Sequence, residues 1–345
     1  MAAWLHSQNA ALAVTTYQIG KLFLIGAPEP DRLTVAERTF DRCLGVAVHG
    51  NSLFLAALNS ILRFDNVVPA GQALEGQDRV YVPRISWYTG DVFAHDVGVL
   101  DSGRPVFINT LFGCLATVDE ASSFRPIWAP PFLSAMRPED RCHLNGLAML
   151  DGRPVFATAA ARSDTAGAWR EARVGGGVVL DIASSAIVAT GLSMPHSPRI
   201  HQGRLYVCNA GTGELGEVEL ASGRFNPIAF CPGFVRGLAV VDGYALVGLS
   251  LPRQHRDFSG LPLDDRLKAE NREPECLVQV IDLATGQAVH WLRIGGVVRE
   301  LYDIALVPGA RTPMVVGFGQ GAINRLITRG ATATLEELGV AGARG

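Results

Sequence analysis

The sequence predicts an all-β fold, a six-bladed β-propeller that is closed by its N-terminal strands. Three observations support this prediction: a short phrase recurs six times, strands and turn residues fill the intervals, and helical periodicity is almost absent. The phrase is most complete at residues 141–148, Arg-Cys-His-Leu-Asn-Gly-Leu-Ala, and an apolar strand follows it at residues 153–157. Seven blades are the less favoured alternative because the phrase recurs six times.

The copies of the phrase lie roughly 40 to 66 residues apart, which is typical of one four-stranded blade per repeat. A single blade cannot bury both of its faces, so each repeat must pack against its neighbours. Closing the repeats into a ring then leaves only short sheet edges exposed. The equivalent positions in the six copies are Leu44, His95, Asn145, His196, Arg236 and Tyr302.

Three strands at residues 12–18, 21–26 and 33–40 precede the first copy and have no inner strand of their own. The last copy, at Tyr302, has a second apolar strand at residues 313–316 and then runs out of chain. We therefore expect the N-terminal strands to complete the blade that begins near the C-terminus. This organisation predicts one domain over residues 1–328, followed by a flexible tail, rich in Gly and Ala, over residues 329–345.

Within the blades, pairs such as Asp-Gly at 151–152 and 242–243 are typical of tight hairpin turns. Residues 263–273 are the one segment with a helical tendency. Two connections between second and third strands are long, residues 160–176 in the third blade and 250–276 in the fifth. In a propeller such connections open on the face where the inner strands begin, so we expect both to lie over the channel mouth.

Composition excludes several classes of partner. The 30 basic and 33 acidic residues nearly balance and form no long basic stripe, which argues against nucleic acid. No apolar run approaches the roughly 20 residues that span a bilayer, and the N-terminus lacks a secretory pattern. We therefore expect a cytoplasmic protein without a membrane partner. Its 6 cysteines show no C-x-x-C spacing, which predicts buried free thiols and not zinc knuckles or disulfides.

Histidines from three successive blades, His95, His143 and His196, are predicted to converge at the channel mouth and to hold a divalent transition metal. Imidazole suits zinc, copper or iron. The candidates for orienting a ligand or moving protons are Asp96, Glu300 and Asp303. Two other interpretations remain open. The histidines can hydrogen-bond backbone groups and water in the channel, or one of them can act as an acid or base without a metal.

Further polar and aromatic residues fall in the repeated phrases, at the ends of second strands or in the long loops. Arginines there can hold a carboxylate or phosphate through two parallel hydrogen bonds, whereas bracing of loops and capping of turns are the alternative roles. The substrate-binding candidates are Asn109, Arg141, Asn145, Asp164, Trp169, Arg199, Asn209, Arg236, Arg253 and Tyr302.

Several phrases resemble an uncharacterised bacterial family, a domain of unknown function, over residues 12–317. They are Thr-Thr-Tyr-Gln at 15–18, Asp-Arg-Cys-His-Leu-Asn-Gly-Leu-Ala at 140–148, Pro-His-Ser-Pro-Arg at 195–199 and Pro-Gly-Phe-Val-Arg-Gly-Leu at 232–238. The Asn-Gly-Leu-Ala strand start is also remotely similar to the six-bladed gluconolactonases and strictosidine synthases. In gluconolactonases, metal ligands cluster at the channel mouth. This chain offers histidines where those enzymes use carboxylates and amides, so the resemblance implies their fold and not their calcium or lactonase chemistry.

The leading hypothesis is a metal-dependent enzyme that acts on a small polar or anionic molecule at the channel mouth, by hydrolysis, elimination or oxidation. The alternative from another class is a non-catalytic propeller that binds a peptide or a small ligand. A scaffold that uses its outer rim is disfavoured because the distinctive residues fall on inner strands and long loops. Propellers host many unrelated functions, so the fold does not choose among these hypotheses.

Overall fold

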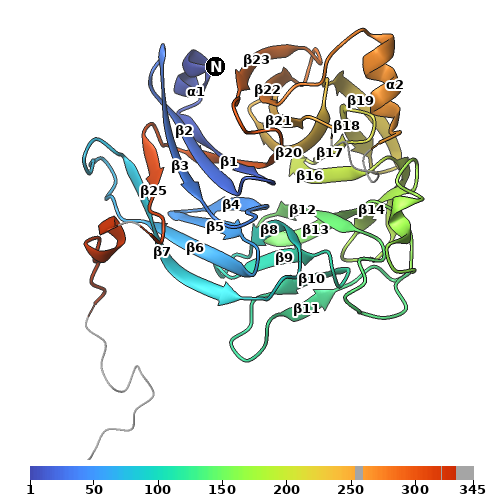
Figure 1. Cartoon of the computed structure of the whole chain (residues 1–345), viewed down its shortest axis with the longest axis horizontal. Helices are drawn as coiled ribbons and strands as arrows, with labels where there is room; N and C mark the ends of the chain where they lie inside the picture. The colour runs from blue at the N-terminus through green and yellow to red at the C-terminus, as the bar shows by residue number, and fades with distance from the viewer. Residues whose placement is uncertain (253–258, 320, 332–345) are drawn as a thin grey trace, which may run out of the picture.

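A computed structural model describes residues 1–252, 259–319 and 321–331. These residues form six sheets arranged in a ring, with the first strand of each blade nearest the centre (Figure 1). The inner strands pack side by side in the order β4, β8, β12, β16, β20 and β24, and β24 returns to β4. The predicted six-bladed propeller is therefore confirmed.

Each blade contains four strands that follow one another from the channel outward. Blade 1 contains β4 (Val46–His49), β5 (Ser52–Ala56), β6 (Ser60–Asn66) and β7 (Arg79–Tyr88). Blade 2 contains β8 (Ala94–Val99), β9 (Pro105–Asn109), β10 (Cys114–Thr117) and β11 (Arg125–Trp128). Blade 3 contains β12 (Leu144–Leu150), β13 (Arg153–Ala159), β14 (Gly177–Asp181) and β15 (Ile187–Leu192).

The other three blades repeat this order, and the last of them joins the two ends of the chain. Blade 4 contains β16 (Pro195–His201), β17 (Arg204–Asn209), β18 (Glu214–Glu219) and β19 (Arg224–Phe230). Blade 5 contains β20 (Phe234–Val241), β21 (Tyr244–Ser250), β22 (Leu277–Asp282) and β23 (Ala288–Arg293). Blade 6 contains β24 (Leu301–Pro308), β1 (Ala10–Thr16), β2 (Lys21–Glu29) and β3 (Arg32–Thr39).

The ring is closed by the pairing of β1 with β24, as predicted. The two strands run antiparallel, with Ala10 opposite Pro308. All seven residues of β1 are buried. Because successive side chains of a strand point to opposite faces, Leu12 and Val14 pack toward blade 5, whereas Ala11 and Ala13 pack toward blade 1. The N-terminal strand therefore lies inside the hydrophobic core.

The C-terminal segment departs from the prediction. Residues 313–316 were expected to form the second strand of the last copy, but β25 (Pro313–Val315) pairs in parallel with β7 at the outer edge of blade 1. This follows from the closure, because β1 already occupies the edge of β24. The proposed tail falls largely on residues 332–345, outside the described residues, and stays a prediction.

Helices are short and lie outside the sheets. Among the described residues they are α1 (Ala2–Ser7), α2 (Pro262–Ala269) and two 3₁₀ turns, Ala168–Arg170 and Gly321–Asn324. The second helix lies in the segment that had a helical tendency, whereas the first was not expected. It is held by Trp4 and Leu5, which are buried against blades 5 and 6. No helix among the described residues is long and apolar enough to cross a membrane.

The hydrophobic core is divided among the blade contacts. Among the described residues, one cluster of buried apolar side chains lies between each pair of neighbouring blades. The apolar packing that holds the ring together therefore lies in the interfaces between the blades.

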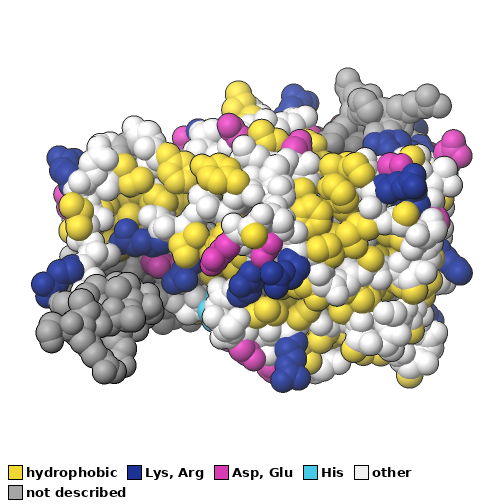
Figure 2. Space-filling view, turned by 90° about the horizontal axis from the view of Figure 1, so that it is seen from below, with side chains coloured by type: hydrophobic (Ala, Val, Ile, Leu, Met, Phe, Trp, Pro, Cys, Tyr) yellow, Lys and Arg dark blue, Asp and Glu magenta, His cyan; other side chains and the backbone are white. Residues whose placement is uncertain are grey.

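On the side of the ring that Figure 2 shows, the lysine and arginine side chains of the described residues are interspersed with acidic and apolar ones and form no continuous basic band.

Glycine and hydrogen-bonding residues alternate around the channel, one position after the start of each repeat. Blades 1, 3 and 5 have Gly45, Gly146 and Gly237, and blades 2, 4 and 6 have Asp96, Ser197 and Asp303. A Cβ atom on Gly45 would lie 2.8 Å from the Cα of Asp96, and one on Gly237 would lie 2.9 Å from the Cα of Asp303. Each glycine thus makes room for the backbone of the following blade.

The glycine contacts join blade 1 to 2, blade 3 to 4 and blade 5 to 6. The hydrogen-bonding residues connect each of these pairs to the next. Asp96 accepts a hydrogen bond from the backbone N–H of Leu147, Ser197 accepts one from Gly237, and Asp303 accepts one from Val46. The three distances are 2.9, 2.9 and 3.0 Å. Close glycine contacts within the pairs and hydrogen bonds between them therefore alternate around the channel.

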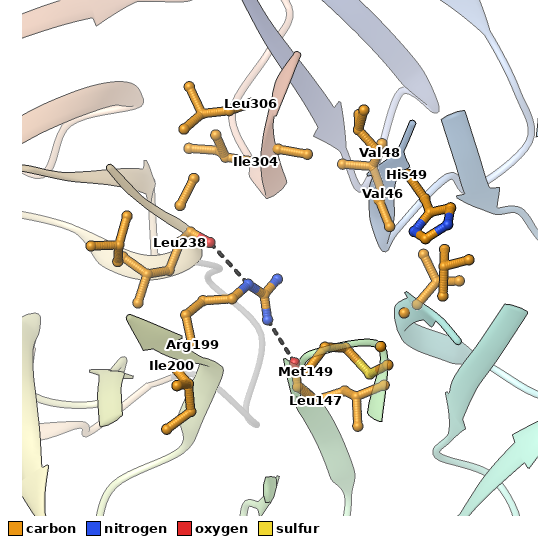
Figure 3. A pocket seen from close by; sticks show the side chains of 18 residues that line it. Val46, Val48, His49, Leu147, Met149, Arg199, Ile200, Leu238, Ile304 and Leu306 are labelled. Atoms are coloured by element: carbon orange, nitrogen blue, oxygen red, sulfur yellow. Dashed lines mark hydrogen bonds between the residues drawn. The ribbon is translucent and has the colours of Figure 1, made fainter. Parts of the chain in front are cut away.

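Arg199 of β16 reaches the centre of this ring and closes the channel. Its guanidinium donates to Asp96 at 3.0 Å and to Asp303 at 3.1 Å. It also donates to the backbone oxygens of Leu147 and Leu238, at 2.9 and 3.0 Å (Figure 3). Burial and the neighbouring charge of Asp96 raise the pKa of Asp303 to about 7, against the lowering effect of Arg199. Beyond Arg199, toward the ends of the inner strands, lies a cavity of about 420 Å³ with mainly aliphatic walls.

Candidate functional site

A second, smaller cavity of about 140 Å³ lies at the channel mouth, where the inner strands begin. It brings together the three histidines that the sequence predicts to converge, and rings from several blades surround them. Its lining residues are Tyr17, Phe93, His95, Asp140, His143, Trp169, Arg170, Met194, His196, Arg236 and Tyr302.

His95 in blade 2 and His196 in blade 4 are held by equivalent hydrogen bonds to the backbone two residues earlier. Phe93 and Met194, two residues earlier, have left-handed backbone angles, with φ of 55° and 50°. Their carbonyl oxygens lie 2.9 Å and 2.8 Å from Nδ1 of His95 and His196. Because a carbonyl oxygen can only accept, Nδ1 carries the hydrogen and the lone pair of each neutral ring lies on Nε2.

Electrostatics keep His95 neutral. Burial, and then the nearby charge of His143, lower the pKa of His95 well below 6.5. The ring centroids of His95 and His143 are 4.8 Å apart, with the rings nearly perpendicular at 82°. Thr110 lies 2.7 Å from Nδ1 of His95 and donates its own hydrogen to Leu144 at 2.6 Å, so it too accepts from this ring. His95 therefore presents a lone pair and no positive charge.

His143 sits on the turn before β12 and is paired with Asp140. Its Nδ1 lies 3.0 Å from one carboxylate oxygen of Asp140, and Nε1 of Trp169 donates to the same oxygen at 2.9 Å. Trp169 also stacks on His143 with centroids 4.0 Å apart. Although burial raises it, the charge and hydrogen bond of His143 and the hydrogen bond of Trp169 leave the pKa of Asp140 below its ordinary value. Burial raises the pKa of Cys142, the residue next to His143, to about 12, so its thiol stays protonated and is a poor nucleophile.

Tyr302 and Arg236 form another part of the cavity wall, and Glu300 supports Arg236 from behind. The carboxylate of Glu300 accepts from the guanidinium of Arg236 at 2.6 Å, and both side chains are buried. Arg236 also donates to the backbone oxygen of Leu301 at 2.9 Å. Its guanidinium carbon lies 4.7 Å from the ring centroid of Tyr302, which stacks on Tyr17 with centroids 6.1 Å apart. The charge of Arg236 is therefore compensated inside the wall.

The other predicted acidic residues lie deeper than the cavity. Asp96 and Asp303 contact Arg199 at the channel axis and do not line the mouth. Glu300 lies behind Arg236. Of the three residues predicted to orient a ligand or move protons, none lines the mouth cavity.

The predicted substrate-binding residues divide between the cavity and its supports. Trp169, Arg236 and Tyr302 line the cavity. Arg141 pairs with Glu139 and Asp164, both at 2.7 Å, and so braces the loop that carries Trp169.

The asparagines support turns and strands. The side-chain oxygens of Asn109 and Asn209 accept from the backbone N–H groups of Phe112 and Ser193, at 3.1 and 2.7 Å. The side-chain oxygen of Asn145 accepts from Thr158 at 2.7 Å. Arg253 lies outside the described residues.

Both long loops were expected over the mouth. The first, residues 160–176, brings Trp169 into the cavity wall. The described part of the second brings Leu261 and Leu263 into the buried cluster that contains Trp169 and Met194. In its described part the second loop therefore supports the wall from behind.

Sequence reasoning missed five lining residues as site candidates: Tyr17, Phe93, Asp140, Arg170 and Met194. The spacing of Asp140, three residues before His143 in a turn, was a signal that pointed to a partner for the imidazole. Phe93 and Met194 were visible as residues two positions before a repeat start. Tyr17 follows β1, outside the six copies, and carries no repeat signal.

The predicted metal site requires its ligands to lie close together, and the side chains do not meet this condition. Among the described residues, no group of three or more His, Cys, Asp or Glu side chains is close enough together to hold one ion. The chemistry of the three histidines does suit a transition metal. Each has an oxygen acceptor at Nδ1, which is the usual support for an imidazole that binds a metal through Nε2.

Comparison with solved structures shows the same architecture. A chain of the nidogen/laminin complex is similar with a TM-score of 0.55 and 12% identity, over 87% of this chain and 99% of that one. Virginiamycin B lyase from Staphylococcus aureus is similar with a TM-score of 0.41 and 10% identity, over 68% of this chain and 76% of that one. At 12% identity, the likeness to the chain of the nidogen/laminin complex shows the fold alone.

Comparison with protein families is more specific. No curated protein matches the chain. A family model described as a domain of unknown function, DUF4915, matches residues 1–316. Because the match spans every blade, the chain belongs to this family of propeller proteins.

Proposed function

We propose that the protein is an enzyme that acts on a small polar molecule in the mouth cavity, with His143 as the acid or base. The observation that carries this proposal is the His143–Asp140 pair in the cavity wall, with 3.0 Å between Nδ1 and the carboxylate. A buried imidazole that is oriented by a carboxylate is the usual arrangement of a catalytic histidine.

The pair favours proton transfer at Nε2 of His143. Its Nδ1–H is committed to Asp140, so the lone pair of the neutral ring lies on Nε2. When Nε2 takes a proton, the carboxylate stabilises the imidazolium, and Trp169 holds that carboxylate in place. Removal of a proton from the substrate or from a water molecule begins both eliminations and hydrolyses. Arg170, at the exposed rim, adds positive charge for an anionic group of the substrate.

A second candidate is a metal-dependent form of the same site. It is favoured by one observation, the oxygen acceptors at Nδ1 of His95, His143 and His196. Zinc, copper or iron on the three Nε2 atoms would polarise a substrate or activate water, or, for copper and iron, support an oxidation. Binding one ion requires the imidazoles to move closer together than they lie.

Replacing His143 by glutamine tests the first proposal. Purified protein is incubated in deuterated water with a library of small hydroxy acids, esters and ketones, and proton NMR follows substrate loss and exchange of C–H hydrogens. We expect the wild type to convert at least one compound, and His143→Gln to convert it about 10²- to 10⁴-fold more slowly. His49→Gln, at the far end of the channel, is the matched control and should retain full activity.

Two results would contradict this proposal. Equal conversion by His143→Gln would remove the assigned role of the imidazole. Capture of a library compound or a peptide without any conversion, in the presence of zinc, copper or iron, would favour the non-catalytic binding propeller.

Elemental analysis of protein purified without an affinity tag tests the second candidate. Stoichiometric zinc, copper or iron is expected in the wild type, and it should be lost when His95 and His196 are both replaced by alanine. The variant His49→Ala serves as the control, because His49 does not line the mouth cavity. Metal that persists in the double variant would overturn the assignment of these ligands.

We further propose that the protein works in the cytoplasm. All six cysteines are free and buried, and burial raises the pKa of Cys43 and Cys114 to about 12. Unpaired thiols of this kind suit a reducing compartment.

A further inference from the structure

The hydroxyl of Tyr302 is a buried polar group without a hydrogen-bond partner among the described residues, on a side chain that lines the mouth cavity. The side chain is 4% exposed and lines the cavity, and its hydroxyl oxygen finds no hydrogen-bond partner among the residues that the structure describes. A buried hydroxyl without a partner is costly, so such groups normally meet another polar atom, from the protein, from water or from a ligand. The position of Tyr302 in a cavity wall points to a ligand.

The surroundings of Tyr302 keep its hydroxyl protonated and hold its ring in place. Burial raises the pKa of Tyr302 well above 10, so the phenol keeps its hydrogen at neutral pH. The guanidinium of Arg236, which Glu300 and the backbone hold in place, lies 4.7 Å from the ring centroid. Tyr17 stacks on the same ring, with centroids 6.1 Å apart and 23° between the planes. The hydroxyl is therefore presented from a rigid ring.

The shape of the cavity limits the ligand. Its volume is about 140 Å³, close to the roughly 150 Å³ of an engineered protein cavity that takes up benzene. Rings form much of the wall, among them Trp169, Phe93 and Tyr17. A ligand that fills this space has the size of one six-membered ring, and flat walls favour a flat molecule.

The polar group near Tyr302 complements it. The ring centroids of His95 and Tyr302 are 5.8 Å apart. Because His95 commits Nδ1–H to Phe93, its Nε2 can only accept a hydrogen bond while the ring is neutral. The cavity wall thus offers a donor on Tyr302 and an acceptor on His95, on two neighbouring rings.

We propose that the mouth cavity binds a flat, single-ring hydroxy compound, whose oxygen accepts a hydrogen bond from Tyr302 and whose O–H donates to Nε2 of His95. Phenols and the enol forms of cyclic ketones have this chemistry, since one oxygen serves both contacts. The inference rests on the proposed function, because it names the substrate class of the same site, and it makes Tyr302 a specificity-determining residue.

The test uses three probes of nearly equal size and measures their binding by calorimetric titration. Phenol has the ring and the hydroxyl, toluene has the ring alone, and cyclohexanol has the hydroxyl on a ring that is not flat. We expect the wild type to bind phenol about fivefold to tenfold more tightly than toluene, and also more tightly than cyclohexanol. In Tyr302→Phe the preference for phenol over toluene should disappear, and toluene affinity should stay within twofold.

Two controls separate recognition from folding. Tyr206→Phe removes the hydroxyl of a buried tyrosine in blade 4, outside the cavity lining, and should leave all three affinities unchanged. Tyr302→Phe should not lower the unfolding midpoint, because the hydroxyl that it removes has no partner among the described residues. A lower midpoint would assign the hydroxyl a structural role and overturn the inference.

The outcomes also separate this inference from the proposed function. A preference for phenol that persists in Tyr302→Phe overturns the inference, as does equal binding of phenol and toluene by the wild type. A preference that depends on Tyr302, in a protein that converts no compound of the library, supports the inference and counts against the enzyme. Conversion that depends on His143, in a protein that does not bind phenol, supports the proposed enzyme and overturns the inference.

Discussion

Replacing Arg199 by methionine is expected to lower the free energy of unfolding by about 3–5 kcal/mol. The guanidinium lies between Asp96 and Asp303, at 3.0 and 3.1 Å, and both of these carboxylates are buried. Removing the cation leaves two buried carboxyl groups in the channel without their partner, and the backbone oxygens of Leu147 and Leu238 lose their donor. Urea unfolding, followed by circular dichroism, measures the loss.

Two comparisons make this prediction specific. Arg204→Met removes an exposed partner of Glu217 and should cost no more than about 1 kcal/mol. Adding Asp96→Asn and Asp303→Asn to Arg199→Met removes the unbalanced charge and should restore part of the stability. If Arg199→Met is as stable as the wild type, the charged cluster does not hold the blades together.

Alanine at Gly237 is expected to lower the free energy of unfolding by about 3 kcal/mol or more, the sum of backbone strain and overpacking. Gly237 has a φ of 76°, in the left-handed region, and a Cβ atom there would lie 2.9 Å from the Cα of Asp303. Blades 5 and 6 would have to separate, and the hydrogen bond from Gly237 to Ser197 would lengthen. The same urea titration measures the change.

Gly243 provides the matched control for this variant. It lies in the next turn of blade 5, with a φ of 81°, and a Cβ atom on it would meet no other atom within 4 Å. Gly243→Ala should therefore cost only the backbone strain, about 1–2 kcal/mol. Equal losses in the two variants would show that the contact between blades adds nothing at Gly237.

The architecture was predictable because a propeller repeats. Each blade packs against its neighbours in the same way, so each copy of the phrase has the same structural role. The three N-terminal strands had no inner strand of their own, and only the last copy lacked outer strands to pair with. The segment at residues 313–316 broke the pattern for a physical reason. Its expected position beside β24 was already filled by β1, and a repeat pattern contains no information about pairing with β7 at an outer edge.

The site was predictable in part. Alignment of the repeats gives the depth of each residue in the channel, so the meeting of His95, His143 and His196 in one cavity wall followed from it. It does not say which partners meet across the ring. Asp96 of blade 2 and Asp303 of blade 6 both contact Arg199 of blade 4, because one long side chain crosses the axis. The contribution of Tyr17 depends on the closure of the ring.

The pairing of β1 with β24 also has a consequence for synthesis. The residues of β1 leave the ribosome well before those of β24, because Pro308, opposite Ala10, lies about 300 residues further along the chain. Until then blade 6 lacks its inner strand, and the apolar faces of β1 await a partner. A nascent chain of this protein therefore carries an unpaired apolar strand while the five intervening blades are made, and the ring closes only after β24 has emerged.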